Sequence, residues 1–370
     1  MSDQHSALDD LNPQQRAAVV HEGSPLLIVA GAGSGKTRVL TRRIAYLLSD
    51  RNVSPQEVLA ITFTNKAAGE MKERVLDLVG NKAKLMQVST FHSACVRFLR
   101  SDAQKLGRTS TFSIYDSQDS LRLITMIAAG LEINSKVLSP RSLASQISNL
   151  KSELIDHESY SRKVETEQER LVAQVYSEYD QRLARANAFD FDDLIGATVA
   201  LLQLFPDVKQ KFRKRFKHIL VDEYQDTNHV QHELLKLMGL TKDKILAIDS
   251  VCAVGDEDQS IYSWRGATVD NIMYFQNDFK NTYLIKMEQN YRSKEPILHV
   301  ANAVIQNNNN RNEKKLWSDK GHGELIRIIN CRNDDDEAER VAKEIITHKL
   351  RNANEWQDYA VLYRSNFQAR

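Results

Sequence analysis

The sequence predicts an α/β fold in which helices cover both faces of a parallel sheet. Short β-rich apolar segments recur along the chain, and each is followed by a polar or helical stretch. Strands that alternate with helices are typical of crossover units, which build parallel sheets. The alternation stops between residues 107 and 196, where apolar residues recur at helical spacing. We therefore expect an α/β domain with a helical insertion, followed by the start of a second α/β domain near residue 281.

The individual elements follow from these patterns. The predicted strands are the segments 26–30, 58–62, 86–89, 218–221, 283–287, 325–329 and 360–363. Within the insertion, a helix is indicated by the apolar residues Val172, Val175, Tyr176, Tyr179 and Leu183. A structureless connector of that length would be unusual in a compact domain. The acidic run 334–337 predicts the first turn of a helix over 338–350, because carboxylates suit a helix N-terminus.

Composition sets wider limits. The 370 residues allow two or three domains, and 42% hydrophobic with 27% charged residues is ordinary for a globular protein. No apolar run approaches the roughly 20 residues of a membrane span. Cys95, Cys252 and Cys331 are too few and too far apart for a disulfide framework or a zinc site, so we expect a reducing, cytoplasmic location. The net charge of +1 does not indicate nucleic-acid binding, although charges sorted onto separate faces would still permit it.

A phosphate-binding loop is the strongest local signal. It is the sequence Ala30-Gly31-Ala32-Gly33-Ser34-Gly35-Lys36-Thr37, directly after a predicted strand. Its three glycines let backbone N–H groups surround a phosphate, and the following helix directs its N-terminus at the same anion. Lys36 would reach the β- and γ-phosphates of ATP, and Thr37 would bind Mg²⁺. Ala30 stands where the motif usually has glycine. A plain glycine-rich turn is the alternative, but the strand–loop–helix context favours the phosphate loop.

Two acids complete the expected ATP site. Asp222 and Glu223 follow the apolar strand 218–221. Asp222 is placed to hold Mg²⁺, and Glu223 to polarise the attacking water. Alone, the two acids could simply cap a helix. The phosphate loop upstream favours catalysis.

Several sequence blocks resemble the UvrD, Rep and PcrA helicases of superfamily 1, from about residue 11 to residue 370. The blocks occur in the family's order and are 11–15 (LNPQQ), 62–68 (TFTNKAA), 89–93 (STFHS), 222–227 (DEYQDT), 254–266 (VGDEDQSIYSWRG) and 288–293 (EQNYRS). The resemblance implies a RecA-like ATP-binding domain in two segments, 1–106 and 197–280. It places the helical insertion at 107–196 and an incomplete second RecA-like domain at 281–370.

The resemblance also implies roles in the ATP site. Gln15 would read the adenine, and Tyr291 would stack on it. Arg292 would reach the γ-phosphate, as a fixed charged fork can, and Gln259 would sense that phosphate. Arg38, which follows the phosphate loop, would also contact the nucleotide.

The same family likeness implies a surface for single-stranded DNA. The contact residues would be Phe63, Asn65, Lys66, His92, Tyr262, Trp264 and Arg265. Aromatic rings stack on unpaired bases without sequence preference. The alternatives are that Tyr262 and Trp264 are core aromatics and that His92 is a structural histidine. We read the basic run 211–217 as a solvated helix end, and the segment 189–194 as a helix cap.

As a whole, the resemblance implies an ATP-dependent helicase that moves 3′-to-5′ on single-stranded or tailed duplex DNA. It would be associated with the nucleoid, with repair or replication proteins as further partners. Family members continue beyond the segment 360–366, so we expect a fragment that alone hydrolyses ATP slowly and does not unwind DNA. Three alternatives remain open: a P-loop kinase or small-molecule ATPase, a DNA-binding regulator without turnover, and the motor of a helicase–nuclease. The sequence indicates neither the pathway nor the oligomeric state.

Overall fold

The computed structural model describes residues 7–263, 266–308, 311–363, 365 and 368. The chain divides into two compact units, Met1–Gly321 and His322–Arg370, which are treated separately below. No helix among the described residues has the length and apolar character needed to cross a membrane.

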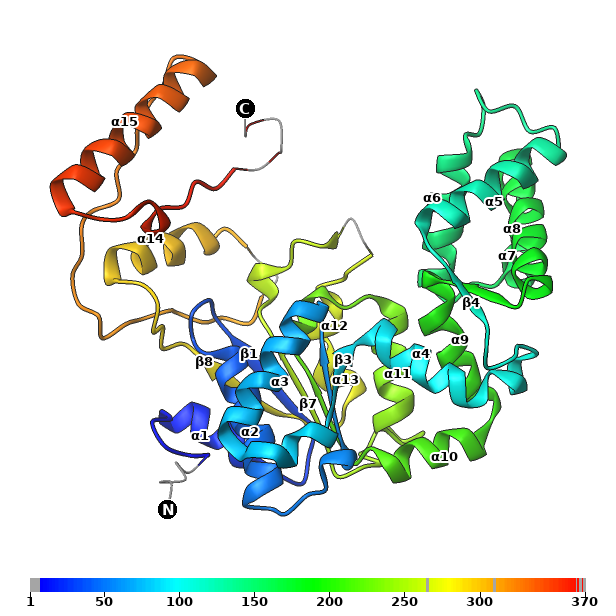
Figure 1. Cartoon of the computed structure of the whole chain (residues 1–370), viewed down its shortest axis with the longest axis horizontal. Helices are drawn as coiled ribbons and strands as arrows, with labels where there is room; N and C mark the ends of the chain where they lie inside the picture. Colours follow the sequence, from blue (N-terminus) through cyan, green and yellow to red (C-terminus); the bar gives the residue numbers. More distant parts are fainter. Residues whose placement is uncertain (1–6, 264–265, 309–310, 364, 366–367, 369–370) are drawn as a thin grey trace. The chain divides into compact units, whose positions relative to one another are not determined.

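A six-stranded parallel sheet forms the centre of the first unit (Figure 1), in the order β3-β2-β6-β7-β1-β8. Its strands are β1 (Leu26–Ala30), β2 (Val58–Thr62), β3 (Gln87–Thr90), β6 (His218–Val221), β7 (Ser250–Gly255) and β8 (Tyr283–Met287). Every residue of β1, β2, β6 and β7 is buried. Burial on both faces is what the uninterrupted apolar runs predict for a parallel sheet. The α/β fold is thereby confirmed.

Two hydrophobic cores lie on opposite faces of this sheet. Alternate residues of β1 divide between them: Leu26 and Ile28 enter one core, and Leu27 and Val29 the other. The first core is closed by α1 (Pro13–Val20), α2 (Lys36–Ser49) and α3 (Asn65–Val79). The second is closed by α4 (Phe91–Asp102), α9 (Phe191–Leu204), α10 (Pro206–Arg215), α11 (His229–Gly239), α12 (Asp270–Met273) and α13 (Phe275–Asp278). The helix α14 (Glu295–Ile305) follows β8.

The predicted insertion is a helical body with its own core. It contains α5 (Ser117–Gly130), α6 (Pro140–Ser152), α7 (His157–Ser161) and α8 (Glu167–Arg185). The five apolar residues noted in α8 are all buried in this core. The sequence did not indicate the two short parallel strands at its root, β4 (Ser113–Tyr115) and β5 (Ala188–Asp190), which pair with each other.

A buried ionic cluster ties the insertion to α9. The Lys151 ammonium in α6 lies 2.8 Å from Asp190, 2.7 Å from Asp193 and 3.5 Å from Asp180. Asp190 also caps α9, as the sequence predicted, in a reciprocal capping box with Asp193. Burial raises the pKa of Asp193 to about 7 despite the lysine beside it.

Some predicted strands differ from the structure. The segments 325–329 and 360–363 do not form strands, so those two predictions are wrong. A strand needs a hydrogen-bonded neighbour, and in these segments Leu325 and Leu362 are 82% and 94% exposed. Conversely, β7 was not predicted although it lies between β6 and β1. The segment 283–287, expected to open a second domain, pairs as β8 with β1 of the first sheet.

The second unit contains α15 (Asp334–Asn352), which confirms the helix predicted after the acidic run. Asn333 caps it by accepting a hydrogen bond from the backbone N–H of Asp336. Four carboxylates occupy its first turn and two basic residues its last, the arrangement that the helix dipole favours.

Candidate functional site

The phosphate loop joins the end of β1 to the start of α2. Gly33 and Gly35 have φ angles of 69° and 91°, in the left-handed region that glycine adopts without strain. Lys36 and Thr37 form the first turn of α2, whose backbone N–H groups have no acidic side chain to cap them. Ala30 is the last residue of β1 and fully buried. It keeps ordinary strand geometry, so the absence of glycine there does not disturb the loop.

The paired acids stand at the end of β6, across from this loop. The Lys36 ammonium lies 2.9 Å from a carboxylate oxygen of Glu223. Glu223 has a φ of 47°, a left-handed conformation that is costly for a residue with a Cβ and is found mainly where surrounding structure imposes it. Burial, followed by the charge of Glu223, raises the pKa of Asp222 to about 6.

One cavity of about 340 Å³ brings the catalytic candidates together. Thr37, Asp222, Glu223 and Gln259 line it, as the sequence analysis expected of a single site. The aromatic residues Phe63 and Tyr262 line the same cavity. Four of the ATP-site candidates and two of the DNA candidates thus line the same cavity.

This cavity offers oxygen ligands that suit Mg²⁺. The Thr37 hydroxyl and the Asp222 carboxylate are hard oxygen donors. A bound cation would favour the charged carboxylate of Asp222, whose pKa is raised by burial and then by the charge of Glu223. Within the described ranges, no group of three or more His, Cys, Asp or Glu residues has the arrangement of a metal site. Thr37 and Asp222 could supply two ligands of a cation whose remaining ligands come from nucleotide phosphates or water.

A glutamine connects the acid pair to the predicted γ-phosphate sensor. The Gln225 amide donates to Glu223 at 2.8 Å, and its oxygen accepts from the backbone N–H of Asp256 at 2.9 Å. The Gln259 side chain in turn donates to the Asp256 carboxylate. The sequence analysis did not single out Gln225, although it lies inside the quoted block 222–227 and could have been found there.

The predicted adenine end is preorganised by polar contacts. Gln15 is fully buried and donates to the backbone oxygen of Ser34, 3.0 Å away, while its own oxygen caps α1 by accepting from the Asn12 N–H. Reading an adenine would require Gln15 to exchange one of these partners. Tyr291 is 39% exposed, and its hydroxyl accepts from Asn12 at 2.8 Å.

The segment after β8 lies against the phosphate loop. Asn290 donates to the backbone oxygen of Ala32 at 2.6 Å, and the Tyr291 N–H donates to that of Gly33 at 2.9 Å. Arg292 is exposed, and its Cβ would lie 2.9 Å from a Cβ added at Gly33. The Arg38 guanidinium instead donates to the backbone oxygen of Asp10. Arg292 therefore lies beside the loop, whereas Arg38 is engaged elsewhere.

The predicted DNA residues of the segment 62–68 and Tyr262 lie in and beside the cavity. The rings of Phe63 and Tyr262 lie 4.9 Å apart, and both are only partly buried, which argues against the core alternative for Tyr262. Asn65 opens α3, and Lys66 next to it has an 87% exposed side chain. Trp264 and Arg265 lie outside the described residues.

A second aromatic pair lies on α4 and α9. The rings of His92 and Phe191 meet edge to face at 6.1 Å. Burial lowers the pKa of His92, whereas Phe191 is 47% exposed. Phe191 directly follows the capping residue Asp190. The interpretation of the segment 189–194 as a helix cap did not predict that this ring would be exposed. The basic run ends α10, and its Arg213 donates to the final carbonyls of α11, in keeping with a structural role.

Models of two helicase domains match this chain. The model of the UvrD/REP helicase N-terminal domain matches residues 11–280, and that of the UvrD-like helicase C-terminal domain matches residues 285–370. The chain belongs to the UvrD/REP helicase family. It is 56% identical to the ATP-dependent DNA helicase UvrD1 of Mycobacterium tuberculosis over 98% of its own length. It is 48% identical to the ATP-dependent DNA helicase PcrA of Staphylococcus aureus over 99% of its length.

This UvrD/REP chain spans about half the length of these relatives, 48% of UvrD1 and 49% of PcrA. The two family domains meet between residues 280 and 285. The strand β8 lies at this junction and is hydrogen-bonded to β1. The segment that follows it, which includes Tyr291 and Arg292, consequently leaves the first sheet directly beside the phosphate loop.

Proposed function

We propose that the chain is the ATP-hydrolysing part of a helicase that moves 3′-to-5′ on single-stranded DNA and unwinds duplexes during repair or replication restart. The observation that carries the proposal is the shared cavity, in which Thr37, Asp222, Glu223 and Gln259 lie beside the aromatic pair Phe63–Tyr262. An ATPase that acts on small molecules would have no need of such a pair.

The residues divide the work of phosphoryl transfer. Thr37 and Asp222 would hold Mg²⁺, which neutralises phosphate charge when bound. Lys36 would leave Glu223 for the phosphates, since an anion with several charges attracts the ammonium more strongly than one carboxylate does. Glu223, held by Gln225, would then orient the attacking water. Gln259 and Arg292 would contact the γ-phosphate, and Tyr291 would stack on the adenine.

The DNA strand would run along the aromatic residues. Phe63 and Tyr262 would stack on bases, joined by Trp264 and by His92 with the exposed Phe191. Asn65, Lys66 and Arg265 would contact phosphates. Because Tyr262 follows Gln259 by three residues, a change at the γ-phosphate would reach the DNA contact through a short stretch of backbone.

The test is ATP turnover by the full-length protein with and without single-stranded DNA. Strong stimulation is expected, together with strand displacement from 3′-tailed but not 5′-tailed duplexes. Turnover that ignores DNA would favour the kinase or small-molecule ATPase alternative. Displacement from 5′-tailed duplexes alone would contradict the polarity.

Turnover should also decline as the pH falls below about 6, the value to which burial raises the pKa of Asp222. Above this pH the carboxylate is charged and available to Mg²⁺, whereas below it protons compete for the same oxygens. Raising the Mg²⁺ concentration should therefore restore the rate at low pH. Asp226 has a similarly raised pKa of about 6 and makes a matched control. Asp226→Asn should keep the rescue by Mg²⁺, and a low-pH loss that Mg²⁺ cannot reverse in wild type would contradict the assignment to Asp222.

A further inference from the structure

Three consecutive acids precede the predicted sensor Gln259, and we call residues 256–258 the acidic turn. Lys314 lies 56 residues after Asp258 in the sequence, yet its ammonium contacts all three carboxylates. Its distances are 2.8 Å to Asp256, 3.0 Å to Glu257 and 2.8 Å to Asp258. Arg311 adds a second cation, 3.0 Å from Asp258.

This cluster is withdrawn from water and has one more carboxylate than it has cations. The side chains of Lys314, Asp256 and Glu257 are only 2%, 3% and 1% exposed. Although burial opposes its charge, the carboxylates led by Asp256 raise the pKa of Lys314. Three carboxylates face two cations, and one oxygen each of Glu257 and Asp258 lacks a hydrogen-bond partner among the described residues. Loss of either cation would leave buried negative charges opposed by one partner only.

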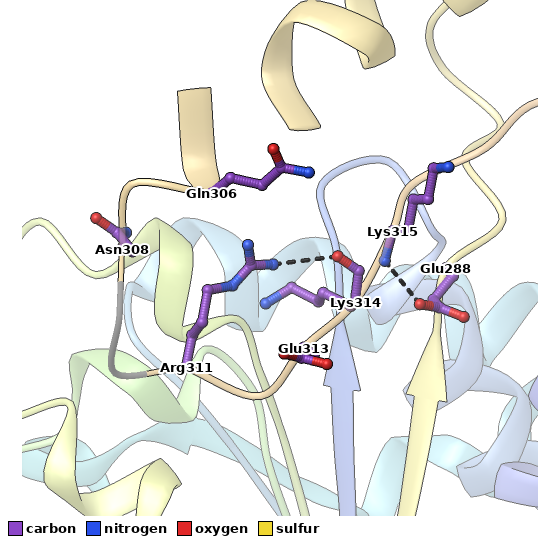
Figure 2. Close-up of a pocket in the computed structure, with 7 residues that line it drawn as sticks. All are labelled: Glu288, Gln306, Asn308, Arg311, Glu313, Lys314 and Lys315. Atoms are coloured by element: carbon purple, nitrogen blue, oxygen red, sulfur yellow. Dashed lines mark hydrogen bonds between the residues drawn. The ribbon is translucent and has the colours of Figure 1, made fainter. Parts of the chain in front are cut away.

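The segment that carries Lys314 also contacts the phosphate loop. Leu316, two residues on, packs so closely that a Cβ added at Gly31 would lie 2.2 Å from its Cδ2. Figure 2 shows Arg311 and Lys314 reaching the same side of the segment while Lys315 points away. Lys315 is held through its backbone N–H, which donates to Glu288 at 2.7 Å.

We propose that Lys314 is a positioning residue for ATP hydrolysis, which holds the acidic turn so that Asp256 keeps Gln259 and Gln225 in place. The inference rests on the proposed function, since it assumes that Gln259 and Glu223 act on ATP. The Asp256 carboxylate accepts a hydrogen bond from the side-chain amide of Gln259. The Asp256 backbone N–H donates a hydrogen bond to the side-chain oxygen of Gln225. Gln225 in turn holds Glu223. Lys314 therefore holds Asp256, which contacts Gln259 directly and Glu223 through Gln225.

The inference predicts an effect on turnover rather than on ATP binding. In the full-length protein, Lys314→Met should lower kcat by up to about 10²-fold, the cost of a small misplacement of catalytic groups. The KM for ATP should change little, because no lost contact touches the nucleotide. Lys314→Arg, which keeps the charge, should recover most of the rate. Lys315→Met removes an adjacent lysine outside the cluster and should match wild type.

A double-mutant cycle with Gln259→Ala tests whether Lys314 acts through the sensor. If it does, Lys314→Met should cost much less in the Gln259→Ala background than in wild type. Should Lys314→Met fail to fold, Lys314→Met combined with Asp258→Asn removes one charge of each sign and keeps the balance of the cluster. That double variant should fold, as circular dichroism would show, and still turn over slowly.

The inference is overturned if Lys314→Met, or the charge-balanced double variant, keeps kcat within about twofold of wild type. Full additivity with Gln259→Ala would overturn it as well. These outcomes differ from a failure of the proposed function, in which wild-type protein itself would show no DNA-stimulated turnover.

Discussion

Replacing Glu223 by Gln in the full-length protein should slow ATP turnover by roughly 10²- to 10⁴-fold, the range for loss of a general base. The amide keeps the size of the carboxylate and its contact with Gln225, but it cannot take a proton from water. ATP and Mg²⁺ should still bind, because Asp222, Thr37 and Lys36 remain. Single-turnover kinetics together with the binding of a fluorescent ATP analogue would separate the two steps.

Two comparisons sharpen this prediction. Glu73→Gln makes the same exchange at an exposed position of α3 and should leave the rate unchanged. Lys36→Ala should instead weaken nucleotide binding itself, since it removes the cation expected at the phosphates. Near-normal turnover by Glu223→Gln would show that another group serves as the base.

Removing the aromatic pair with Phe63→Ala and Tyr262→Ala should weaken single-strand binding by about 1–3 kcal/mol for each base that loses its stack. The loss should be similar for different DNA sequences, because every base offers a ring face. DNA should also stimulate turnover less, since Tyr262 lies three residues from Gln259. Fluorescence anisotropy with labelled oligonucleotides would measure the affinity, which should fall steeply with salt in wild type as phosphate contacts release counterions.

Tyr274→Ala is a suitable control, because Tyr274 is 52% exposed and lies outside the proposed DNA surface. Trp264→Ala should behave like the aromatic pair if the family resemblance assigns that residue correctly. Unchanged affinity and unchanged stimulation in the Phe63–Tyr262 double variant would refute the stacking surface.

The sequence predicted most of the sheet because local signals and global structure agree there. The strands β1, β2, β6 and β8 match their predicted bounds. The first three are fully buried apolar runs, whereas in β8 only Ile285 and Met287 are buried. The segments 325–329 and 360–363 have equally strong local propensity, but no neighbouring strand pairs with them among the residues that the structure describes. Propensity alone cannot supply a partner. The strand β7 was missed because Ser, Cys, Ala and Gly dilute the apolar signal of its two valines.

In the candidate site, too, local motifs were predictable from the sequence and contacts between distant segments were not. The sequence motifs grouped Lys36, Thr37, Asp222 and Glu223, and the family resemblance added Gln259. The structure places the last four of these five residues around one cavity. Contacts over long sequence separation could not be predicted. The ion pairs from Lys314 to the acidic turn, and the contact of Leu316 with Gly31, depend on the path of the chain after β8. No local pattern marks Lys314 among its basic neighbours.

The short strands β4 and β5 make the insertion a detachable module. Because they are adjacent and in register, the chain leaves and re-enters the ATP-binding domain at one point. Evolution or an engineer could exchange the helical body there without altering the order of the six-stranded sheet. The exchange has one constraint, which is that the new helical body must supply a lysine at the position of Lys151. Asp190 and Asp193 lie on the domain side of the joint, so a transplanted body without a matching lysine would leave their charges buried and unopposed.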